Sequence, residues 1–163
     1  MSTPPTIRPL EARDLPELEC LCREHARFER ADWGEGPREQ GLYRWFLGEG
    51  TARCWVVEAD PDAPYTLAGF ASANLELSTW DAASYAHLDC LYLREPYRRR
   101  GFGRALLARV ADYAQRNGAV NLQWQTPEWN VDAIRFYRRV GATSSTKLRF
   151  RLDPGACRAL ADS

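Results

Sequence analysis

The turn at residues 98–103 constrains the fold of this chain more than any other segment. It reads Arg-Arg-Arg-Gly-Phe-Gly and follows an apolar and aromatic run, His-Leu-Asp-Cys-Leu-Tyr-Leu, at residues 87–93. After the turn, Leu106, Val110 and Ala114 recur at the period of an amphipathic helix. The pattern predicts a buried strand, a tight turn and a long helix in direct succession, as in an α/β domain.

The composition of this turn favours the binding of a phosphate group. A helix N-terminus presents unpaired backbone N–H groups and the positive end of the helix dipole, and glycines let an anion approach the backbone closely. Leu106 occupies the place of the third glycine of a dinucleotide fingerprint, and the only lysine, Lys147, is far from where a P-loop needs one. We interpret the turn as a pyrophosphate site, with a plain tight connection as the alternative.

The charge and the cysteines exclude several classes of function. The 163 residues include 22 Lys+Arg and 22 Asp+Glu, so no net charge favours a nucleic acid or a membrane surface. Five scattered cysteines lack metal-ligand spacing, and only His25 and His87 accompany them. We expect reduced thiols, no metal and no nucleic-acid or membrane partner. Without a leader segment or a long apolar run, we expect one cytoplasmic domain spanning residues 1–163.

Helix and strand signals predict an α/β fold with a mixed, mostly antiparallel sheet flanked by helices. Residues 1–5 are expected to be disordered. Strands are expected at residues 6–9, 53–59, 67–77, 84–93 and 120–125, with a terminal strand region that ends at residue 152. Helices are expected from an N-cap at Asp14, over residues 37–47, from the turn to Asn117-Gly118, and from an N-cap at Asn130 to Val140. We also expect a β-bulge after Leu91 that frees backbone N–H groups.

A second motif lies downstream of the turn. Residues 130–142 follow the pattern Asn-x-x-Ala-x-x-Phe-Tyr-x-x-x-Gly-Ala. Together with the Arg-x-x-Gly-x-Gly turn and the Ile-Arg-Pro opening at residues 7–9, it resembles the GNAT-superfamily N-acetyltransferases over nearly the whole chain. The chain is most similar to the diamine/polyamine acetyltransferases at residues 26–29, 88–93 and 128–130. It departs from them at Asp89-Cys90, where that subfamily commonly has Glu-Asp.

The resemblance implies acetyl transfer from acetyl-CoA to a primary amine of a small molecule, polyamine-like or an amino acid side chain, in a ternary complex. It implies cofactor contacts from Leu91, Tyr92, Leu93, Arg98, Arg99, Arg100, Gly101, Phe102, Gly103, Arg104, Asn130, Ala133 and Tyr137. It implies substrate contacts from Phe28, Glu29, Asp89, Gln123 and Gln125, with Gln123 and Gln125 on one strand face. Homodimerisation is a further expectation taken from the family.

The chemistry of amide formation suggests two catalytic residues. An alkylamine with a pKa of ~10.4 must lose a proton before it attacks. Asp89 is the candidate, acting through an ordered water, as an ammonium anchor or, less directly supported, as the base itself; pairing with an arginine is the structural alternative. Tyr137 is the candidate acid for the departing thiolate, since it lies seven residues, or two turns, after Asn130 on one helix face.

Two other functions remain open for a chain with these motifs. A non-catalytic acyl-CoA-binding or sensing domain would keep the turn without the chemistry, and an acetyltransferase for a protein amine would share both motifs. A nucleic-acid-binding module that rests on the three arginines is the most distant alternative, because no second basic cluster accompanies them.

Overall fold

The computed structural model describes residues 6–163, so the expectation for residues 1–5 lies outside the described part. The chain divides into two compact units, Met1–Pro127 and Glu128–Ser163, which are described separately. The first unit holds a sheet with the strand order β1-β2-β3-β4-β5. Its strands are β1 (Ile7–Pro9), β2 (Arg53–Glu58), β3 (Leu67–Ser78), β4 (Ala83–Leu93) and β5 (Leu122–Gln123).

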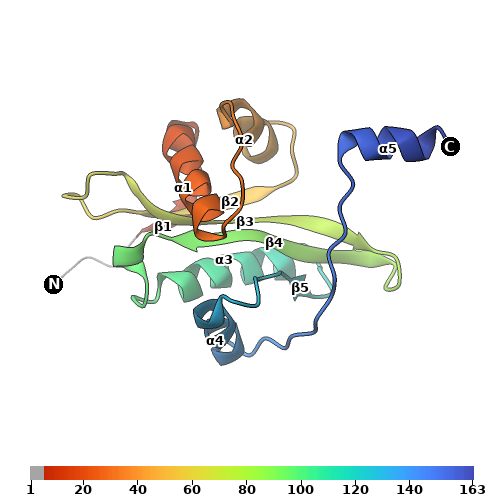
Figure 1. Ribbon diagram of the computed structural model, residues 1–163. Coiled ribbons are helices and arrows are strands. Elements are labelled where there is room, and N and C mark those ends of the chain that lie inside the picture. The colour runs from red at the N-terminus through yellow and green to blue at the C-terminus, as the bar shows by residue number, and fades with distance from the viewer. Residues whose placement is uncertain (1–5) are drawn as a thin grey trace. The chain divides into compact units, whose positions relative to one another are not determined.

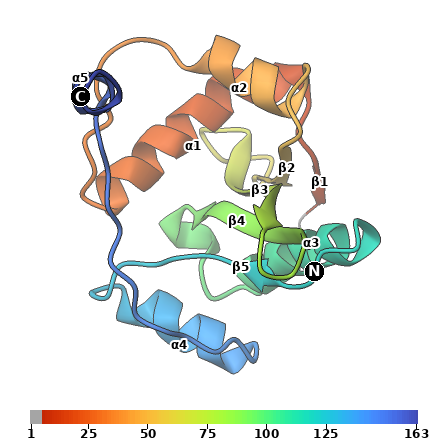
Figure 2. The same cartoon turned by 90° about the vertical axis from the view of Figure 1, so that its right-hand side faces the viewer.

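Three α-helices of the first unit cover both faces of this sheet (Figure 1). Helices α1 (Leu15–Phe28) and α2 (Glu39–Phe46) pack on one face, against β3 and β2. Helix α3 (Phe102–Arg116) packs on the other face, against β2, β3 and β4. The turned view in Figure 2 shows the same two layers of helix around the sheet. Short 3-10 helices, η1 (Ala12–Asp14) and η2 (Glu95–Tyr97), precede α1 and the turn.

The apolar stripes of α1 and α3 form the two halves of the core. Under α1, Leu18, Leu21 and Phe70 are almost fully buried. Under α3, Leu106 and Val110 have no exposed surface. Each such side chain contributes about 1.5–3 kcal/mol when it leaves water, so the predicted helical periodicity accounts for both layers.

The sheet confirms the predicted mixed, mostly antiparallel arrangement and shortens one strand. Strands β1 to β4 are antiparallel neighbours, and β4 pairs with β5 in parallel, at Ala86 with Leu122 and His87 with Gln123 only. The strand expected over residues 120–125 therefore shrinks to two residues. Asp14 is the N-cap of α1 as predicted, although it also ends η1 and its side chain makes no capping hydrogen bond in α1. Helix α2 begins at Glu39, two residues later than predicted.

The second unit contains two helices, α4 (Val131–Arg139) and α5 (Pro154–Ala161). Asn130 caps α4 as predicted, with its side-chain oxygen accepting a hydrogen bond from the Ala133 N–H at 3.3 Å. Gly141 follows the helix at a φ of 93°, which favours glycine. The terminal strand expected up to residue 152 is wrong: residues 142–153 form no strand with any described residue, and Leu148 and Phe150 are 81% and 89% exposed.

No helix among residues 6–163 combines the length and the apolar character that crossing a bilayer requires. All five cysteines carry free thiols.

Candidate functional site

The predicted anion site has a local geometry suited to its task. Arg99 and Gly101 both have positive φ values, 60° and 87°. Gly101 is the N-cap of α3, and the first intrahelical hydrogen bond runs from Ala105 N–H to the Gly101 carbonyl. The N–H groups of Phe102, Gly103 and Arg104 therefore have no partner within the helix. Left-handed residues beside a helix N-terminus form a concave set of N–H groups that fits a phosphate.

The three arginines of this turn lie in different surroundings. Arg98 is half-buried, donates from Nε to the Leu93 carbonyl at 2.8 Å, and lies over the Phe28 ring with its guanidinium carbon 4.9 Å from the ring centroid. Arg100 lies 5.1 Å from each ring centroid of Tyr97 and Phe102 and pairs with Asp60 at 3.5 Å.

Arg99 is exposed, as is Arg104 in the first turn of α3. The three arginines therefore differ in their surroundings: Arg99 is exposed, Arg100 is exposed and lies on two aromatic rings, and Arg98 is half-buried beside α1.

Strand β4 contains a bulge, but not where the sequence predicted it. Ser72 pairs with Cys90 and the next residue, Ala73, pairs with Leu88, so Asp89 is the extra residue. The expectation of a bulge after Leu91 is wrong, because Leu91 and Leu93 remain in register with β3. A bulge places two successive side chains on nearly the same face. Asp89 and Cys90 therefore both face α1, and Cys90 Sγ lies 3.5 Å from Asp89 Oδ2.

The edge of β4 beyond His87 carries no strand among the described residues. Strand β5 ends at Gln123, opposite His87, so the two strands part at this point. Arg94 N–H donates to the Ala68 carbonyl of β3 at 2.9 Å. Alternation then directs the N–H of Tyr92 toward β3 and those of Leu91 and Leu93 toward the open edge. Of the N–H groups at residues 91–93, those of Leu91 and Leu93 therefore point to the open edge. This edge exists because β4 and β5 separate after His87.

An aromatic and charged cluster joins the end of α1 to the second half of β4. His25 stacks on Tyr92 with ring centroids 5.3 Å apart, and Phe28 lies 6.3 Å from the same ring. His25 Nε2 lies 3.3 Å from Glu29 Oε1. Burial lowers the pKa of His25, although Glu29 and then Asp89 act in the opposite direction. Phe28, Glu29 and Asp89 thus all lie around His25, and their contact with a substrate stays a prediction.

His25 is a member of this cluster that sequence reasoning missed. Its position three residues before Phe28, on one face of a helix, was the available signal. Tyr92 was expected to contribute its backbone, but it is the aromatic side chain that lies in the cluster.

Gln123 and Gln125 are not brought into this cluster by any contact among the described residues. Gln123 donates from Nε2 to the Asn121 side chain at 3.0 Å, and Gln125 lies beyond the end of β5. The expected common strand face therefore does not extend to Gln125.

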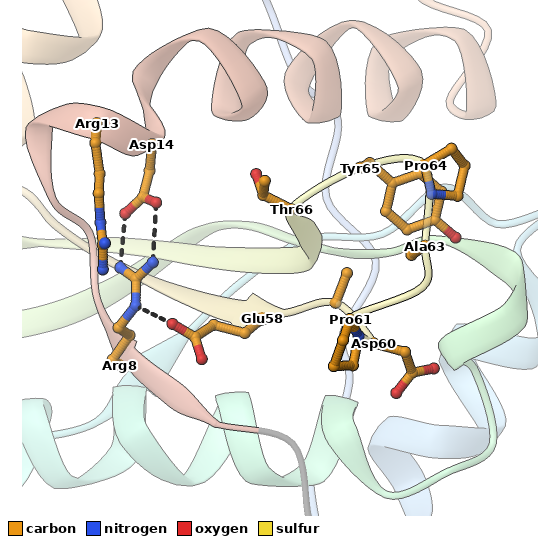
Figure 3. A pocket seen from close by; sticks show the side chains of 11 residues that line it. Arg8, Arg13, Asp14, Glu58, Asp60, Pro61, Ala63, Pro64, Tyr65 and Thr66 are labelled. Atoms are coloured by element: carbon orange, nitrogen blue, oxygen red, sulfur yellow. Dashed lines mark hydrogen bonds and ion pairs between the residues drawn. The ribbon is translucent and has the colours of Figure 1, made fainter.

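A hollow of about 570 Å³ lies between the Arg8 region and the loop at residues 58–66 (Figure 3). Three of its charged residues pair with one another: Arg8 contacts Asp14 at 2.7 and 2.9 Å and Glu58 at 2.7 Å. Burial by itself would raise the pKa of Asp14, but hydrogen bonds from Arg8 and from the Glu11 N–H hold it below its ordinary value. The paired charges give the hollow a structural role that joins β1, η1 and β2.

The second unit holds the other motif on one short helix. Asn130 and Tyr137 lie two turns apart at the start and near the end of α4, and Ala133 lies between them. The Tyr137 ring lies 5.2 Å from that of Phe136. Tyr137 and Ala133 are both half-buried within this unit.

Comparison with known proteins adds the family. The acetyltransferase (GNAT) family profile matches residues 18–142. Thialysine N-epsilon-acetyltransferase of Mus musculus is 28% identical over 165 residues, covering 95% of this chain and 96% of the relative. L-ornithine N5-acetyltransferase NATA1 of Arabidopsis thaliana is 45% identical over 56 residues, which are 34% of this chain and only 25% of the relative.

Among solved structures, an integron cassette protein from the mobile metagenome of V. cholerae superposes with a TM-score of 0.75 at 20% identity. The match covers 99% of this chain and 100% of the other, and it supports the fold. The family profile covers most of the chain, including the turn, the open β4 edge and the whole motif at residues 130–142. The chain therefore belongs to the acetyltransferase (GNAT) family, the acetyl-CoA-dependent N-acetyltransferases.

Proposed function

We propose that the protein transfers the acetyl group of acetyl-CoA to a primary amine of a small molecule, by direct attack in a ternary complex. The observation that carries this proposal is the succession of an acidic bulge, an open strand edge and an anion-binding helix start within residues 89–104 of a GNAT-family chain. The three features supply an amine site, an acyl site and a phosphate site in the order in which the reaction needs them.

Acetyl-CoA supplies an activated acetyl thioester and a pyrophosphate that anchors it. The N–H groups of Gly101, Phe102, Gly103 and Arg104 would bind the pyrophosphate, with Arg99 as the exposed cation beside them. Arg100 already lies on two aromatic rings, and its pair with Asp60 at 3.5 Å leaves its charge available to a stronger anion. Arg98 would act from the α1 side of the turn.

The open edge of β4 would hold the acyl arm. Backbone N–H groups of Leu91 and Leu93 face this edge, and a carbonyl oxygen that gains negative charge is stabilised by such preorganised donors. Side-chain identity at these two positions should matter little to the reaction, because the backbone does the binding.

The acceptor amine would lie in the cluster formed by Phe28, Glu29, Asp89, His25 and Tyr92. Two carboxylates attract an ammonium group, and the rings of Phe28 and Tyr92 offer apolar and cation–π contacts to its carbon chain. The relatives named for thialysine and ornithine act on amino acids that bear a side-chain amine, which favours this class over longer polyamines for the present chain. Gln123 and Gln125 would serve as outer contacts only.

The departing thiolate would take a proton from Tyr137. A phenol with a pKa of ~10 can protonate a thiolate whose conjugate acid has a pKa of ~8.5 only when the two are held close, so a fixed helix position is needed. Asn130 and Ala133 would contact the cofactor from the same helix, although the Asn130 side-chain oxygen is already engaged as the cap of α4.

The test is acetyl-CoA turnover over a panel that contains ornithine, lysine, thialysine, putrescine and spermidine. Thiol release with the amino acids at least tenfold faster than with spermidine supports the proposal. The variant Tyr137→Phe should reduce kcat about 10²-fold and leave CoA affinity within about threefold. Tight CoA binding without turnover on any amine would instead identify a non-catalytic acyl-CoA sensor, and turnover only on a peptide amine would identify a protein acetyltransferase.

We further propose a cytoplasmic homodimer. The exposed apolar side chains of Leu148, Phe150 and Leu152 in the second unit offer surface that a second copy could cover, and the five free thiols suit a reducing compartment. Light scattering gives the mass, and a monomer at 100 µM would contradict the dimer.

A further inference from the structure

A hydrogen-bonded network of Glu76, Tyr85 and His87 lies on the sheet beside the candidate site. Tyr85 donates its hydroxyl to Glu76 Oε2, and His87 Nδ1 lies 2.7 Å from Glu76 Oε1. Glu76 comes from β3 and the other two residues from β4, directly before the bulge. The family motifs do not include these three residues.

The network shares a sheet face with Asp89. Cys90 and Tyr92 pack against the core under α1, and Leu88 is buried on the opposite side. Because side chains alternate along a strand, His87 faces the α1 side like Asp89, about 7 Å away along β4. His87 is also the last β4 residue paired with β5, so it lies where the open edge begins.

The contact with Glu76 fixes which nitrogen of His87 can take up a proton. A carboxylate at Nδ1 favours the proton on Nδ1 and leaves the lone pair on Nε2. The hydrogen bond from Tyr85 and then that from His87 hold the pKa of Glu76 below its ordinary value, so the carboxylate is ionised. An ionised Glu76 also stabilises the imidazolium that forms when Nε2 is protonated.

We propose that His87 Nε2 is the general base of the acetyl transfer, with Glu76 and Tyr85 as positioning residues and Asp89 as the anchor of the substrate ammonium. This inference rests on the proposed function. The ammonium proton passes to Nε2, and the amine lone pair forms a C–N bond to the carbonyl carbon. The C–S bond then breaks, and the thiolate leaves with a proton from Tyr137. The nitrogen of the new amide then loses its second proton to water, water reprotonates the Tyr137 phenolate, and the imidazolium releases its proton, so one proton is released per turnover.

The surrounding groups favour His87 as the general base over the two other candidates, His25 and Asp89. Besides Glu76 and Tyr85, the polar groups on this face include Asn74 opposite His87, Gln123 on β5, and Asp89, Cys90 and Tyr92 farther along β4. His25 and Glu29 of α1 lie above them. His25 is committed to Glu29 and Tyr92, and burial lowers its pKa. Asp89 is exposed at the bulge, where its charge suits an ion pair. The Nε2 lone pair of His87 can accept a proton, because the contact of Glu76 with Nδ1 holds the other ring nitrogen.

The experiment compares His87→Ala with His25→Ala in ornithine acetylation at pH 6 to 9. We expect His87→Ala to lower kcat about 10²–10³-fold, to remove the acidic limb of the pH profile, and to recover activity when imidazole is added. His25→Ala should raise KM, keep the acidic limb and gain nothing from imidazole. Glu76→Gln should lower kcat about tenfold with an unchanged KM.

A His87→Ala variant with kcat within threefold of the unmodified enzyme, or with the same acidic limb, would overturn the inference. Nitrogen NMR of His87 in the unmodified protein gives a second readout that needs no turnover. A proton on Nδ1 with Nε2 bare at pH 8 supports the assignment, and the opposite tautomer refutes it. Absence of turnover in the unmodified protein on every amine would refute the proposed function itself, so the two failures are distinguishable.

Discussion

The two halves of β4, before and after Asp89, differ in every property that matters to the site. The first half is paired with β3 and, at Ala86 and His87, with β5, and its α1-side residues form the polar network with Glu76. The second half is paired on one side only and carries Tyr92 under the aromatic residues of α1. One extra residue separates the segment that carries the proposed base from the segment whose backbone would bind the acyl arm.

This difference shows what a bulge does for a central strand. A regular strand would alternate Asp89 and Cys90 between faces, and only one of them could lie beside α1. The extra residue adds the acidic side chain to the α1 face without displacing the buried Leu88 or the packed Cys90. The carboxylate is an insertion into an otherwise regular hydrophobic pattern.

Deletion of Asp89 removes the bulge that separates the two halves of β4. Among the changes considered, this one should have the largest effect on turnover. The pairs Leu88 with Ala73 and Cys90 with Ser72 then become consecutive, so the core residues keep their faces and the protein should stay folded. Turnover should fall about 10³-fold, because the ammonium anchor is lost and His87 moves relative to the open edge. Circular dichroism and steady-state kinetics measure the two outcomes.

Asp89→Asn is the matched control, since it keeps the bulge and removes only the charge. We expect a rise in the KM for the amine of about tenfold with a smaller change in kcat. A deletion variant that unfolds would contradict the view that the register tolerates one residue less.

Arg94→Met tests how the end of β4 is held against α1 and β3. Arg94 is 8% exposed and contacts Glu17 at 2.6 Å, Glu24 at 2.7 Å and the Leu67 carbonyl at 2.8 Å. Its removal leaves carboxylates facing each other across a buried gap, which costs about 3 kcal/mol. Urea unfolding measures the loss. Arg116→Met, which breaks an exposed pair with Asp112, should cost about 0.5 kcal/mol or less; equal losses would show that burial of Arg94 contributes nothing.

Arg98→Lys tests the link between the turn and the acceptor cluster. The planar guanidinium donates to the Leu93 carbonyl and covers the Phe28 ring, and an ammonium group cannot do both. The expected loss is about 1 kcal/mol, seen as a roughly fivefold rise in the KM for the amine. The KM for acetyl-CoA should change less than that for the amine. A larger rise in the KM for acetyl-CoA would show that Arg98 acts mainly at the pyrophosphate and not in the acceptor cluster.

The pH dependence of stability gives the smallest effect. Burial lowers the pKa of His25 in the folded state, whereas an unfolded histidine titrates near ~6.5. Below that pH the unfolded chain binds a proton that the folded chain does not, so the free energy of unfolding should fall between about pH 7 and pH 5.5. His25→Gln should flatten this slope in urea titrations. A slope that persists unchanged in the variant would assign it to other groups.

Local signals in the sequence predicted much of this molecule. The strand, turn and helix around residues 98–103, the cap at Asn130 and the hairpins follow from period and turn chemistry, which act over a few residues. The bulge at Asp89 could not be located, because its position depends on which β3 residue faces which β4 residue. Its neighbours Leu88 and Leu91 are both apolar, so the pattern alone fits either register.

Other features depend on contacts that no local pattern reports. The sequence alone shows His25 and His87 only as poor metal ligands. Their roles depend on contacts with Glu29 and Glu76, which lie 4 and 11 residues away along the chain. The alternation of Leu148, Phe150 and Leu152 fits a strand, but a strand forms only where a neighbour supplies hydrogen bonds. Among the described residues that neighbour is missing.

The thiol of Cys90, packed beside Asp89, has a consequence for chemoselectivity. A thiolate attacks a thioester faster than an amine does, so a reactive cysteine here would acylate itself. Burial, and then the charge of Asp89, raise the pKa of Cys90 far above its ordinary value, and burial raises that of the adjacent Cys22 to about 12. Both remain protonated at any working pH. In the proposed mechanism, the carboxylate that would attract the amine also helps burial to keep a competing thiol protonated.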